Sequence, residues 1–287
     1  MEWLRQLSQA IDYIEDNLAD DISFDEAAKI ACCSPYYFQR MFSYVAGIPL
    51  SEYIRRRRMT AAAFELQTSD MKVMDIGLKY GYGSPTSFNR AFQSVHGVAP
   101  TAARIEGTPL NAYPRISFSI AVTGGENMKY RVEKKDPIRI VGVRTALQED
   151  VERNFEIAPK FWESTLNDQS FSQICGLTNQ VPAGVLGVSA YQGPEEIYYY
   201  IAAATDKNVP ENMFEYQIPA ATWVIFECYG HYPASIQTVF KRFFTEWLPF
   251  SGYEYAGLPD IEVYPVSSQR IETGKSEVWI AVKKPHD

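Results

Sequence analysis

The sequence predicts two domains: an all-α N-terminal domain with two helix-turn-helix units, then an α+β domain with duplicated βαββ repeats. Three observations point to this fold class. One short pattern, S-P-x-x-F-x-R-x-F, occurs over residues 34–42 and again, at an offset of fifty, over residues 84–92. From Lys129 onward the chain changes to strand-like runs rich in Val, Ile, Tyr and Trp. In that second part the order strand, helix, strand, strand occurs twice.

The first two helices are predicted from apolar spacing and capping residues. Residues 3–18 carry one apolar stripe at intervals of three or four residues, as in an amphipathic helix. Ser23 and Glu26 have the spacing of a capping box, in which each side chain bonds the other's free backbone N–H. They predict a short helix over 24–31. The members of the stripe are Leu4, Leu7, Ile11, Ile14 and Leu18.

The repeated pattern predicts two helices with matching ends. In each copy the serine can accept a hydrogen bond as N-cap, and the proline fits the first helical position, where no N–H is needed. Gly47 and Gly97 can end the two helices in a left-handed conformation. A long helix over 51–67 separates the copies, and "VMDIGLKYGYG" indicates a short helix and turn before the second. With only two copies, this is a duplicated helix-turn-helix unit and not a solenoid.

These patterns assign residues 1–108 to the helical domain, 109–128 to a linker and 129–287 to the α+β domain. The linker prediction rests on Pro109, Pro114 and the glycine pair in "TGGEN", which interrupt regular structure. The strand-like runs are "IRIVGVRTA", "AGVLGVSAYQ", "IYYYIAAA", "ATWVIFECY", "IEVYPV" and "SEVWIAV", and the helical runs are "APKFWESTLND" and "PASIQTVFKRFFTEWLPF".

Composition narrows the possible function classes. No apolar run approaches the ~20 residues that span a bilayer, and the N-terminus lacks signal-peptide features. The four cysteines and three histidines match no metal or disulfide pattern, so we expect free thiols in the cytoplasm and no metal or cofactor. The net charge of −8 is unevenly spread, because residues 1–28 carry eight acids and one arginine (−7) while residues 29–104 carry ten Lys/Arg and four acids (+6). A local basic surface suffices to attract phosphates, because salt screens charges beyond about 8–10 Å.

The repeated helix has the two faces that a DNA-reading helix needs. A major groove about 12 Å wide admits one helix, which must be held by apolar residues and read bases with polar ones. The two phenylalanines of each copy are four residues apart, so they share the face that packs inward. Arginine can bond guanine, and Gln or Asn can bond adenine. The predicted DNA-binding residues are Tyr36, Tyr37, Gln39 and Arg40 in the first copy, and Ser84, Thr86, Asn89 and Arg90 in the second.

The helix between the copies has a length suited to double-stranded DNA. About 18 residues give roughly 27 Å, near the ~34 Å between adjacent major-groove faces. One monomer could therefore place both reading helices. Four consecutive arginines, Arg55 to Arg58, point in successive directions around this helix. We expect one or two to bind phosphate and the others to pair with acids such as Glu52 or those in residues 1–28.

Two stretches of the helical domain resemble a known family. "SPYYFQRMF…GIPLSEYIRRRRM" and "IGLKYGYGSPTSFNRAFQSVHGVAPTAAR" are similar to the AraC-type DNA-binding domain, especially its MarA/Rob type. The resemblance implies a seven-helix domain with two helix-turn-helix motifs, and activation of transcription rather than repression. It also implies contacts to bases and phosphates from the residues that face outward on both repeated helices. Gly77 stands where the family usually has alanine.

The second domain resembles another family. The string "FFTEWLPFSGYEYAGLPDIEVYPV" is similar to the GyrI-like effector-binding domain of BmrR-like sensors. This resemblance implies two βαββ repeats around a pseudo-two-fold axis, with a ligand pocket between them. The order of the two domains is that of the Rob type.

A candidate pocket acid lies in "PDIEVYP". Strand alternation places Glu262 and Tyr264 on one face, opposite Ile261 and Val263. A carboxylate among aromatic rings attracts organic cations by Coulomb forces and by cation–π contacts of about 0.5–2 kcal/mol. We therefore expect a small lipophilic or cationic effector. The predicted effector-binding residues are Glu262, Tyr264, Trp162, Tyr199, Phe226, Tyr229 and Trp247.

These residues leave three functions open. The leading hypothesis is a sequence-specific transcription regulator, not an enzyme, that binds promoter DNA as a monomer, senses a small effector, and contacts RNA polymerase but no membrane. A second is a hydrolase of small reactive compounds, with Glu262 as acid/base beside Tyr264 or Tyr229. In a third, the pocket is vestigial and the domain contacts other proteins or sequesters the regulator.

Overall fold

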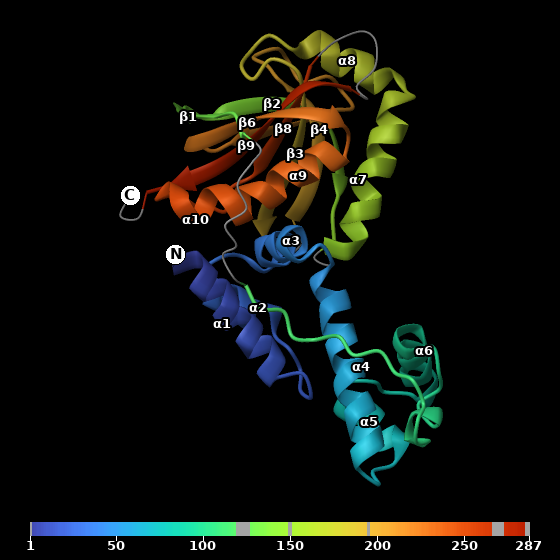
Figure 1. Cartoon of the computed structure of the whole chain (residues 1–287). Helices are drawn as coiled ribbons and strands as arrows, with labels where there is room; N and C mark the ends of the chain where they lie inside the picture. Colours follow the sequence, from blue (N-terminus) through green and yellow to red (C-terminus); the bar gives the residue numbers. More distant parts are fainter. Residues whose placement is uncertain (1, 119–126, 149–150, 194–195, 266–272, 285–287) are drawn as a thin grey trace. The chain divides into compact units, whose positions relative to one another are not determined.

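The computed structural model divides into two compact units, Glu2–Ser119 and Ile120–Asp287. In the described part of the chain the first unit is all-helical, and the second combines one antiparallel sheet with helices (Figure 1). The predicted fold class is confirmed. The structure describes residues 2–118, 127–148, 151–193, 196–265 and 273–284.

The first helix-turn-helix unit forms as the apolar stripe and the caps indicate. Leu7, Ile11 and Ile14 are buried on the inner face of the first helix. Ser23 accepts a hydrogen bond from the backbone N–H of Glu26 (3.3 Å), whereas the Glu26 carboxylate pairs with a lysine instead of returning to Ser23. The predicted cap is therefore formed in one direction only. The helices are α1 (Glu2–Asp16), α2 (Phe24–Ile30) and α3 (Pro35–Ala46).

The second helix-turn-helix unit has the same arrangement and follows a long connecting helix. Ser34 and Ser84 cap α3 and α6 by accepting from the backbone N–H three residues on. Gly47 and Gly97 end them at φ angles of 72° and 76°, as predicted. The connecting helix α4 runs from α3 toward α5 (Figure 1) and is roughly 28 Å long at 1.5 Å per residue. The elements are α4 (Leu50–Thr68), α5 (Val73–Lys79), α6 (Pro85–His96) and the 3₁₀ turn η1 (Ala102–Arg104).

The four consecutive arginines of α4 reach different parts of the helical unit. Successive residues on a helix differ by about 100° in direction, so the guanidinium groups reach different partners, except that Arg55 and Arg56 share Glu52. Pairing with acids is confirmed. Expected phosphate contacts stay a prediction, because every member of the run is engaged within the unit. Arg55 and Arg56 bind Glu52, Arg57 binds Glu15, and Arg58 donates to the backbone oxygens of Leu18 and Asp20.

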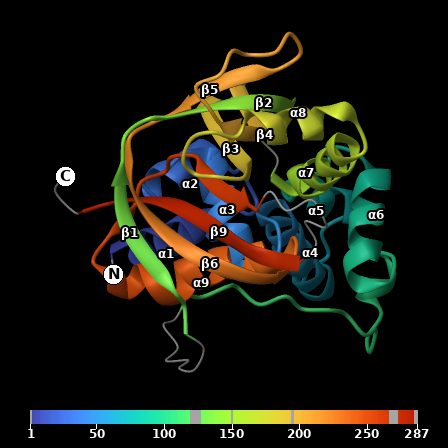
Figure 2. The ribbon, with the colours of Figure 1, turned by 90° about the horizontal axis from the view of Figure 1, so that it is seen from above.

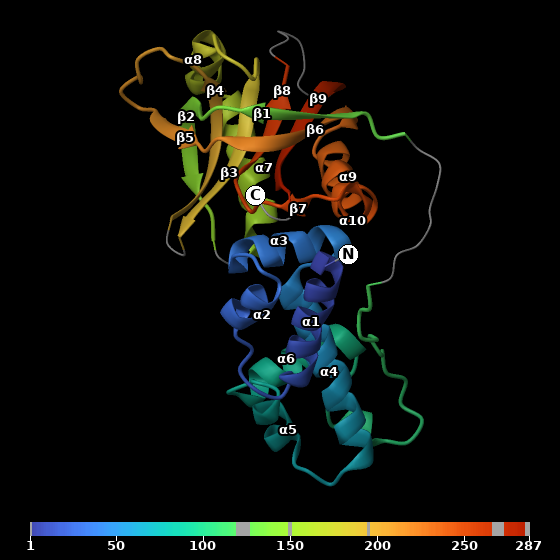
Figure 3. The same cartoon turned by 90° about the vertical axis from the view of Figure 1, so that its left-hand side faces the viewer.

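The α+β unit is built on one curved sheet in which all strand pairs are antiparallel (Figures 2 and 3). Its strand order is β1-β6-β9-β8-β3-β4-β2-β5, with β7 paired to β9. The strands are β1 (Tyr130–Lys135), β2 (Ile138–Ala146), β3 (Val185–Gly193), β4 (Glu196–Ala204), β5 (Phe214–Ile218), β6 (Ala221–His231), β7 (Glu254–Tyr255), β8 (Asp260–Tyr264) and β9 (Thr273–Lys283).

The strand order confirms the predicted duplication. Each strand of the first repeat, β1, β2, β3 and β4, has a counterpart in the second, β5, β6, β8 and β9 respectively. When counterparts are exchanged, the strand order is the same from either edge of the sheet. A pseudo-two-fold axis therefore passes between β3 and β8, the strand pair that joins the two halves. The sequence did not reveal β1 and β5. Each of these short strands pairs across to the other half, β1 with β6 and β5 with β2.

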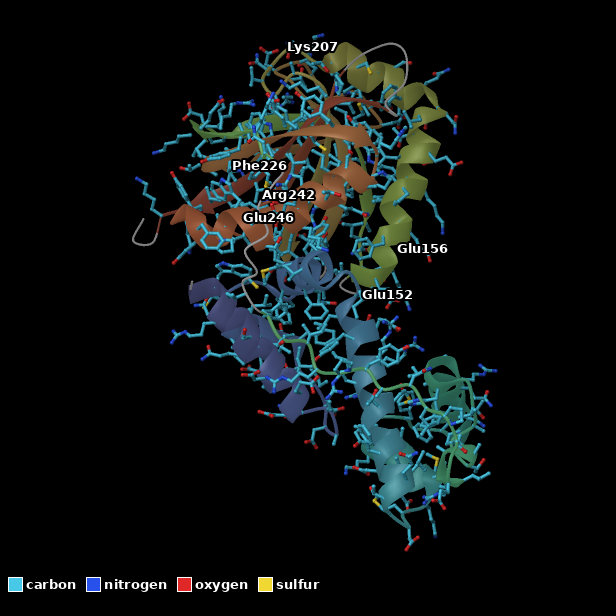
Figure 4. The ribbon with its side chains drawn as sticks, viewed as in Figure 1. Glu152, Glu156, Lys207, Phe226, Arg242 and Glu246 are labelled. Atoms are coloured by element: carbon cyan, nitrogen blue, oxygen red, sulfur yellow. The ribbon has the colours of Figure 1, made fainter. Side chains whose placement is uncertain are left out.

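Helices cover one face of this sheet. Phe226 of β6 contacts Phe243 and Trp247 in the helical stretch 234–251, at 6.1 and 5.8 Å between ring centroids. Figure 4 labels Phe226 together with Arg242 and Glu246 of that stretch. The neighbouring residue Ile225 belongs instead to a core cluster on the opposite face, together with Trp223. Because strand residues alternate, the two faces have separate apolar cores. The helices are α7 (Val151–Leu166), α8 (Gln169–Leu177), α9 (Ala234–Arg242) and α10 (Leu248–Ser251), the last two joined by a π-helical turn, η2 (Phe243–Trp247).

Candidate DNA interface and effector site

The second reading helix presents its predicted contact residues to solvent. Ser84, Thr86, Asn89 and Arg90 are exposed, whereas Phe88 is buried beneath them. Neither Asn89 nor Arg90 has a hydrogen-bond or ion-pair partner among the described residues. The face opposite the apolar core of α6 is therefore polar and open, as a DNA-reading face requires.

Helices α5 and α6 pack closely against each other at Gly77 and Phe88. A Cβ atom at Gly77 of α5 would lie 3.0 Å from Cγ of Phe88, closer than ordinary carbon contacts. The corresponding residue of the first copy, Ala27, carries this methyl group and is fully buried. The departure from alanine at position 77 thus allows α5 and α6 to approach closely around Phe88.

The first reading helix differs in its surroundings. Tyr36, Tyr37, Gln39 and Arg40 all lie on α3, in the first turns of the helix that Ser34 caps. Within the helical unit, the Arg40 guanidinium lies over the ring of Tyr44 (5.6 Å) and donates to its hydroxyl (3.3 Å). Contact of α3 with base edges stays a prediction.

The candidate effector site centres on the carboxylate of Glu262. The hydroxyls of Tyr199 and Tyr264 both donate to its Oε2, at 2.9 and 2.8 Å. Trp162 of α7 donates its indole N–H to the Tyr199 hydroxyl (2.8 Å) and packs edge-on against Tyr264. Four of the predicted effector residues, from β4, α7 and β8, therefore form one hydrogen-bonded group on the helix-covered face.

This group occupies the strand pair through which the pseudo-two-fold axis passes. Gly187 of β3 lies directly opposite Glu262 in the register. A Cβ atom at Gly187 would collide with the hydroxyl of Tyr199 and would lie 2.8 Å from Oε2 of Glu262. A glycine is therefore needed here to leave room for the carboxylate and phenol, which is a common reason for glycine inside a strand.

Burial fixes the protonation state of one phenol in the group. Tyr264 is 6% exposed, and desolvation, followed by the charge of Glu262, raises its pKa well above the ordinary value. The hydroxyl consequently keeps its proton at neutral pH and remains a donor to the carboxylate. Tyr232, just beyond β6, packs edge-on against the same ring at 5.0 Å.

The other predicted wall residues lie elsewhere. Phe226 and Trp247 belong to a second aromatic cluster under η2, in which Trp247 stacks on Phe243. Tyr229 is 59% exposed and donates to Glu227 (2.8 Å). Strand alternation from Ile225 puts Tyr229 on the sheet face opposite the helices, so a Glu262–Tyr229 acid/base pair does not form.

Two residues of the site were missed in the sequence. Tyr232 follows the end of a strand-like run, and no local pattern distinguishes it from the many other tyrosines. Gly187 carried a usable signal, since an isolated glycine within "VLGVSAY" indicates close approach of another group.

Comparison with known proteins agrees with this architecture. The family model of the GyrI-like small molecule binding domain matches residues 128–283, more than half of the chain. The chain belongs to the GyrI-like family. A helix-turn-helix domain model matches residues 27–105 of this GyrI-like protein. Its helical unit is thus a helix-turn-helix domain fused to the family domain, of the AraC type.

The curated relatives match the helical part of this GyrI-like protein. The HTH-type transcriptional activator AarP of Providencia stuartii is 40% identical over 105 residues, which cover 37% of this chain and 78% of AarP. The regulatory protein SoxS of Salmonella typhimurium is 39% identical over 83 residues, covering 29% of this chain and 78% of SoxS. A Staphylococcus aureus protein of known crystal structure is 18% identical, and the match covers 55% of this chain and 99% of that protein, with a TM-score of 0.48.

AarP and SoxS are named as regulators, which supports a DNA-binding transcription regulator and not an enzyme such as the hydrolase considered above. Among the described residues, no group of three or more His, Cys, Asp or Glu side chains has a metal-binding arrangement. No described helix has both the length and the apolar character needed to cross a bilayer.

Proposed function

We propose that this regulator senses a small lipophilic cation through the Glu262 group of its second domain. The observation that carries the proposal is the placement of one carboxylate among the rings of Trp162, Tyr199 and Tyr264, at the junction of the two repeats. The two phenol donors orient the carboxylate, and Gly187 opposite keeps space around it.

The chemistry of this group favours a cation with an apolar body. A carboxylate in a partly buried setting attracts positive charge more strongly than one in water, because the effective dielectric constant is lower. Aromatic ring faces add cation–π attraction of about 0.5–2 kcal/mol. An anionic ligand would be repelled by Glu262, and a neutral one would gain nothing from its charge.

The test is calorimetric titration of the full chain with tetraphenylphosphonium. We expect Glu262→Gln, which keeps the shape but removes the charge, to weaken binding by at least about tenfold. Glu227→Gln is the matched control, because Glu227 also accepts from a tyrosine hydroxyl (2.8 Å) but lies outside the site. Equal affinity of all three proteins, or no binding to the wild-type chain, would reject the proposal and favour a vestigial pocket.

The DNA-binding half of the proposal concerns how the helical unit reads its target. α3 and α6 each enter a major groove through the residues named above, and one chain supplies both helices, so binding needs no dimer. As in the activator AarP, the outcome is activation, with RNA polymerase as a further partner. Sedimentation of the DNA complex gives the stoichiometry. A two-to-one complex, or an affinity that does not change with salt, contradicts this part.

A further inference from the structure

The segment that follows η1 is an ordered part of the helical unit. Residues 108–116, here called the strap, run in an extended conformation across α4 (Figure 1). The sequence predicts a linker over 109–128, but the compact helical unit extends to Ser119. The strap therefore packs with the helices instead of serving only as a spacer.

Three backbone N–H groups of the strap are bound by side chains of the helices. Asn111 donates to Nδ1 of His96 (3.2 Å), Tyr113 to Oγ1 of Thr60 (3.1 Å) and Ile116 to the Tyr53 hydroxyl (3.2 Å). A flexible linker would leave such groups to water. Each of these bonds instead docks the strap at a separate point on α4 or α6.

The three acceptors are themselves held in place. The Thr60 hydroxyl donates to the backbone oxygen of Arg56 (2.9 Å), and the Tyr53 hydroxyl donates to Glu15 (2.5 Å). Nε2 of His96 lies 3.0 Å from the backbone oxygen of Met59, so the proton must be on Nε2 and the lone pair on Nδ1. Every donor and acceptor in these pairs is used consistently.

A carbonyl group and a ring of the strap complete the contact. Arg57 donates to the backbone oxygen of Tyr113 (2.6 Å) while pairing with Glu15 of α1 (2.8 Å). The Tyr113 ring lies under the Arg56 guanidinium (4.9 Å) and, with Leu110, packs against the core of the second helix-turn-helix unit. The strap thereby joins α1, α4 and α6.

We propose that the strap is a positioning element for DNA reading: docked on α4, it holds α6 in place through His96 and α1 through Arg57 and Tyr53. This inference rests on the proposed reading of DNA by α3 and α6. Two helices can occupy two grooves at once only if their separation is fixed, and a strap tied to α4 at Tyr53 and Thr60 and to α6 at His96 restricts that separation. Its undocking weakens DNA binding without removing any DNA contact.

Hydrogen exchange of the full chain without DNA tests the docking itself. We expect the amides of Asn111, Tyr113 and Ile116 to exchange at least about tenfold more slowly than an unstructured chain, since each is hydrogen-bonded. Exchange at the unstructured rate overturns the proposal. This measurement needs no DNA, so it stands even if the proposed DNA reading fails.

A pair of isosteric substitutions then tests the effect on DNA reading. Thr60→Val removes the acceptor for Tyr113, and Thr68→Val is its matched control, because Thr68 makes the same bond to the carbonyl four residues back (2.7 Å) without touching the strap. With a duplex selected by the wild-type chain from a random library, we expect Thr60→Val to lose about 3–10-fold in affinity. The dependence on salt should not change, because no phosphate contact is lost.

Tyr53→Phe provides a second variant, with Tyr80→Phe as its control, because both lose a hydroxyl bonded to a glutamate and only Tyr53 holds the strap. Faster strap exchange together with weaker DNA binding in Thr60→Val and Tyr53→Phe, but not in the controls, supports the proposal. Faster strap exchange at unchanged affinity overturns it, as do equal losses in the controls or unchanged strap exchange in both variants. Failure of the wild-type chain to select any duplex rejects the proposed function instead.

Discussion

The two reading helices share a framework but differ in what surrounds it. Both begin at a capping serine, bury two phenylalanines and end at a left-handed glycine. In α3 the arginine of the repeated pattern, Arg40, lies over the ring of Tyr44, whereas Arg90 of α6 is exposed and the residue in the place of Tyr44 is Ser94. Ser94 accepts from Arg55 of α4 (2.5 Å) instead. The two copies thus share the residues that hold each helix in its unit and differ in the residues that each helix presents.

The largest expected effect follows from removing the shared framework. Phe38→Ala and Phe88→Ala should each reduce the free energy of unfolding by about 3–5 kcal/mol, because each ring is almost fully buried and leaves a cavity. Phe64→Ala is the control, since Phe64 is 56% exposed, and it should cost less than about 1 kcal/mol. Urea unfolding measures all three. If one framework substitution cost as little as the control, the two copies would not be equivalent.

The next largest effect is on DNA affinity, and it should differ in character between Arg40 and Arg90. Arg90→Ala should weaken binding to a selected duplex by about 1–3 kcal/mol and leave stability nearly unchanged, because the side chain is exposed. Arg40→Ala should weaken DNA binding and also lower stability, because it loses the contact with Tyr44. Lys72→Ala removes an equal charge from the start of α5 and controls for net charge. Unchanged binding by Arg90→Ala would exclude α6 as a base-reading helix.

The parts of the fold that could be predicted are those encoded by local pattern. The caps at Ser34 and Ser84, the glycine stops and the strand-like runs each depend on a few neighbouring residues. The pairing of β1 with β6 and of β5 with β2 could not be predicted, because it joins residues between 72 and 96 positions apart, and β1 and β5 give only weak strand signals of their own. The sequence likewise predicts one helix in this region, whereas the structure has a second, α8, after α7.

The effector site shows the same division. Strand alternation placed Glu262 and Tyr264 together, which depends only on their spacing of two. The choice among the other aromatics depends both on the face of the sheet and on the order of the strands. Tyr199 and Trp162 lie in the Glu262 group. Tyr229 is on the opposite face, whereas Phe226 and Trp247 are on the helix-covered face but in a separate cluster. The sequence predicts a linker where the strap lies, because the hydrogen bonds of the strap go to distant side chains and not to local backbone.

A smaller effect on stability is expected from substituting Ala27 and Gly77, the residues that lie beneath the two reading helices. Ala27→Gly should cost about 1–2 kcal/mol, from lower helix propensity and a lost buried methyl. Gly77→Ala gains about 1 kcal/mol of propensity but must displace the Phe88 ring, so its net effect should be smaller than about 1 kcal/mol. Denaturation midpoints compare the two. Stabilisation by the whole propensity gain would mean that α5 and α6 are less tightly packed than the structure shows.

The smallest expected effect is a pH dependence that only the second copy possesses, since His96 stands where the first copy has Ala46. Burial lowers the pKa of His96 below 6.5, so as the pH falls the unfolded chain takes up this proton first. Stability should therefore fall between pH 7 and pH 5 and rise again as the pH is restored. His96→Gln should show a shallower slope of stability against pH, whereas His231→Gln, at the exposed end of β6, should keep the wild-type slope.

Protonation of His96 also replaces the Nδ1 lone pair that accepts from Asn111 with a donor, so faster exchange of the Asn111 amide at pH 5 should accompany the loss of stability. If stability fell with pH while the Asn111 amide stayed protected, the pH dependence would arise from carboxylates elsewhere and not from the joint between α6 and the strap.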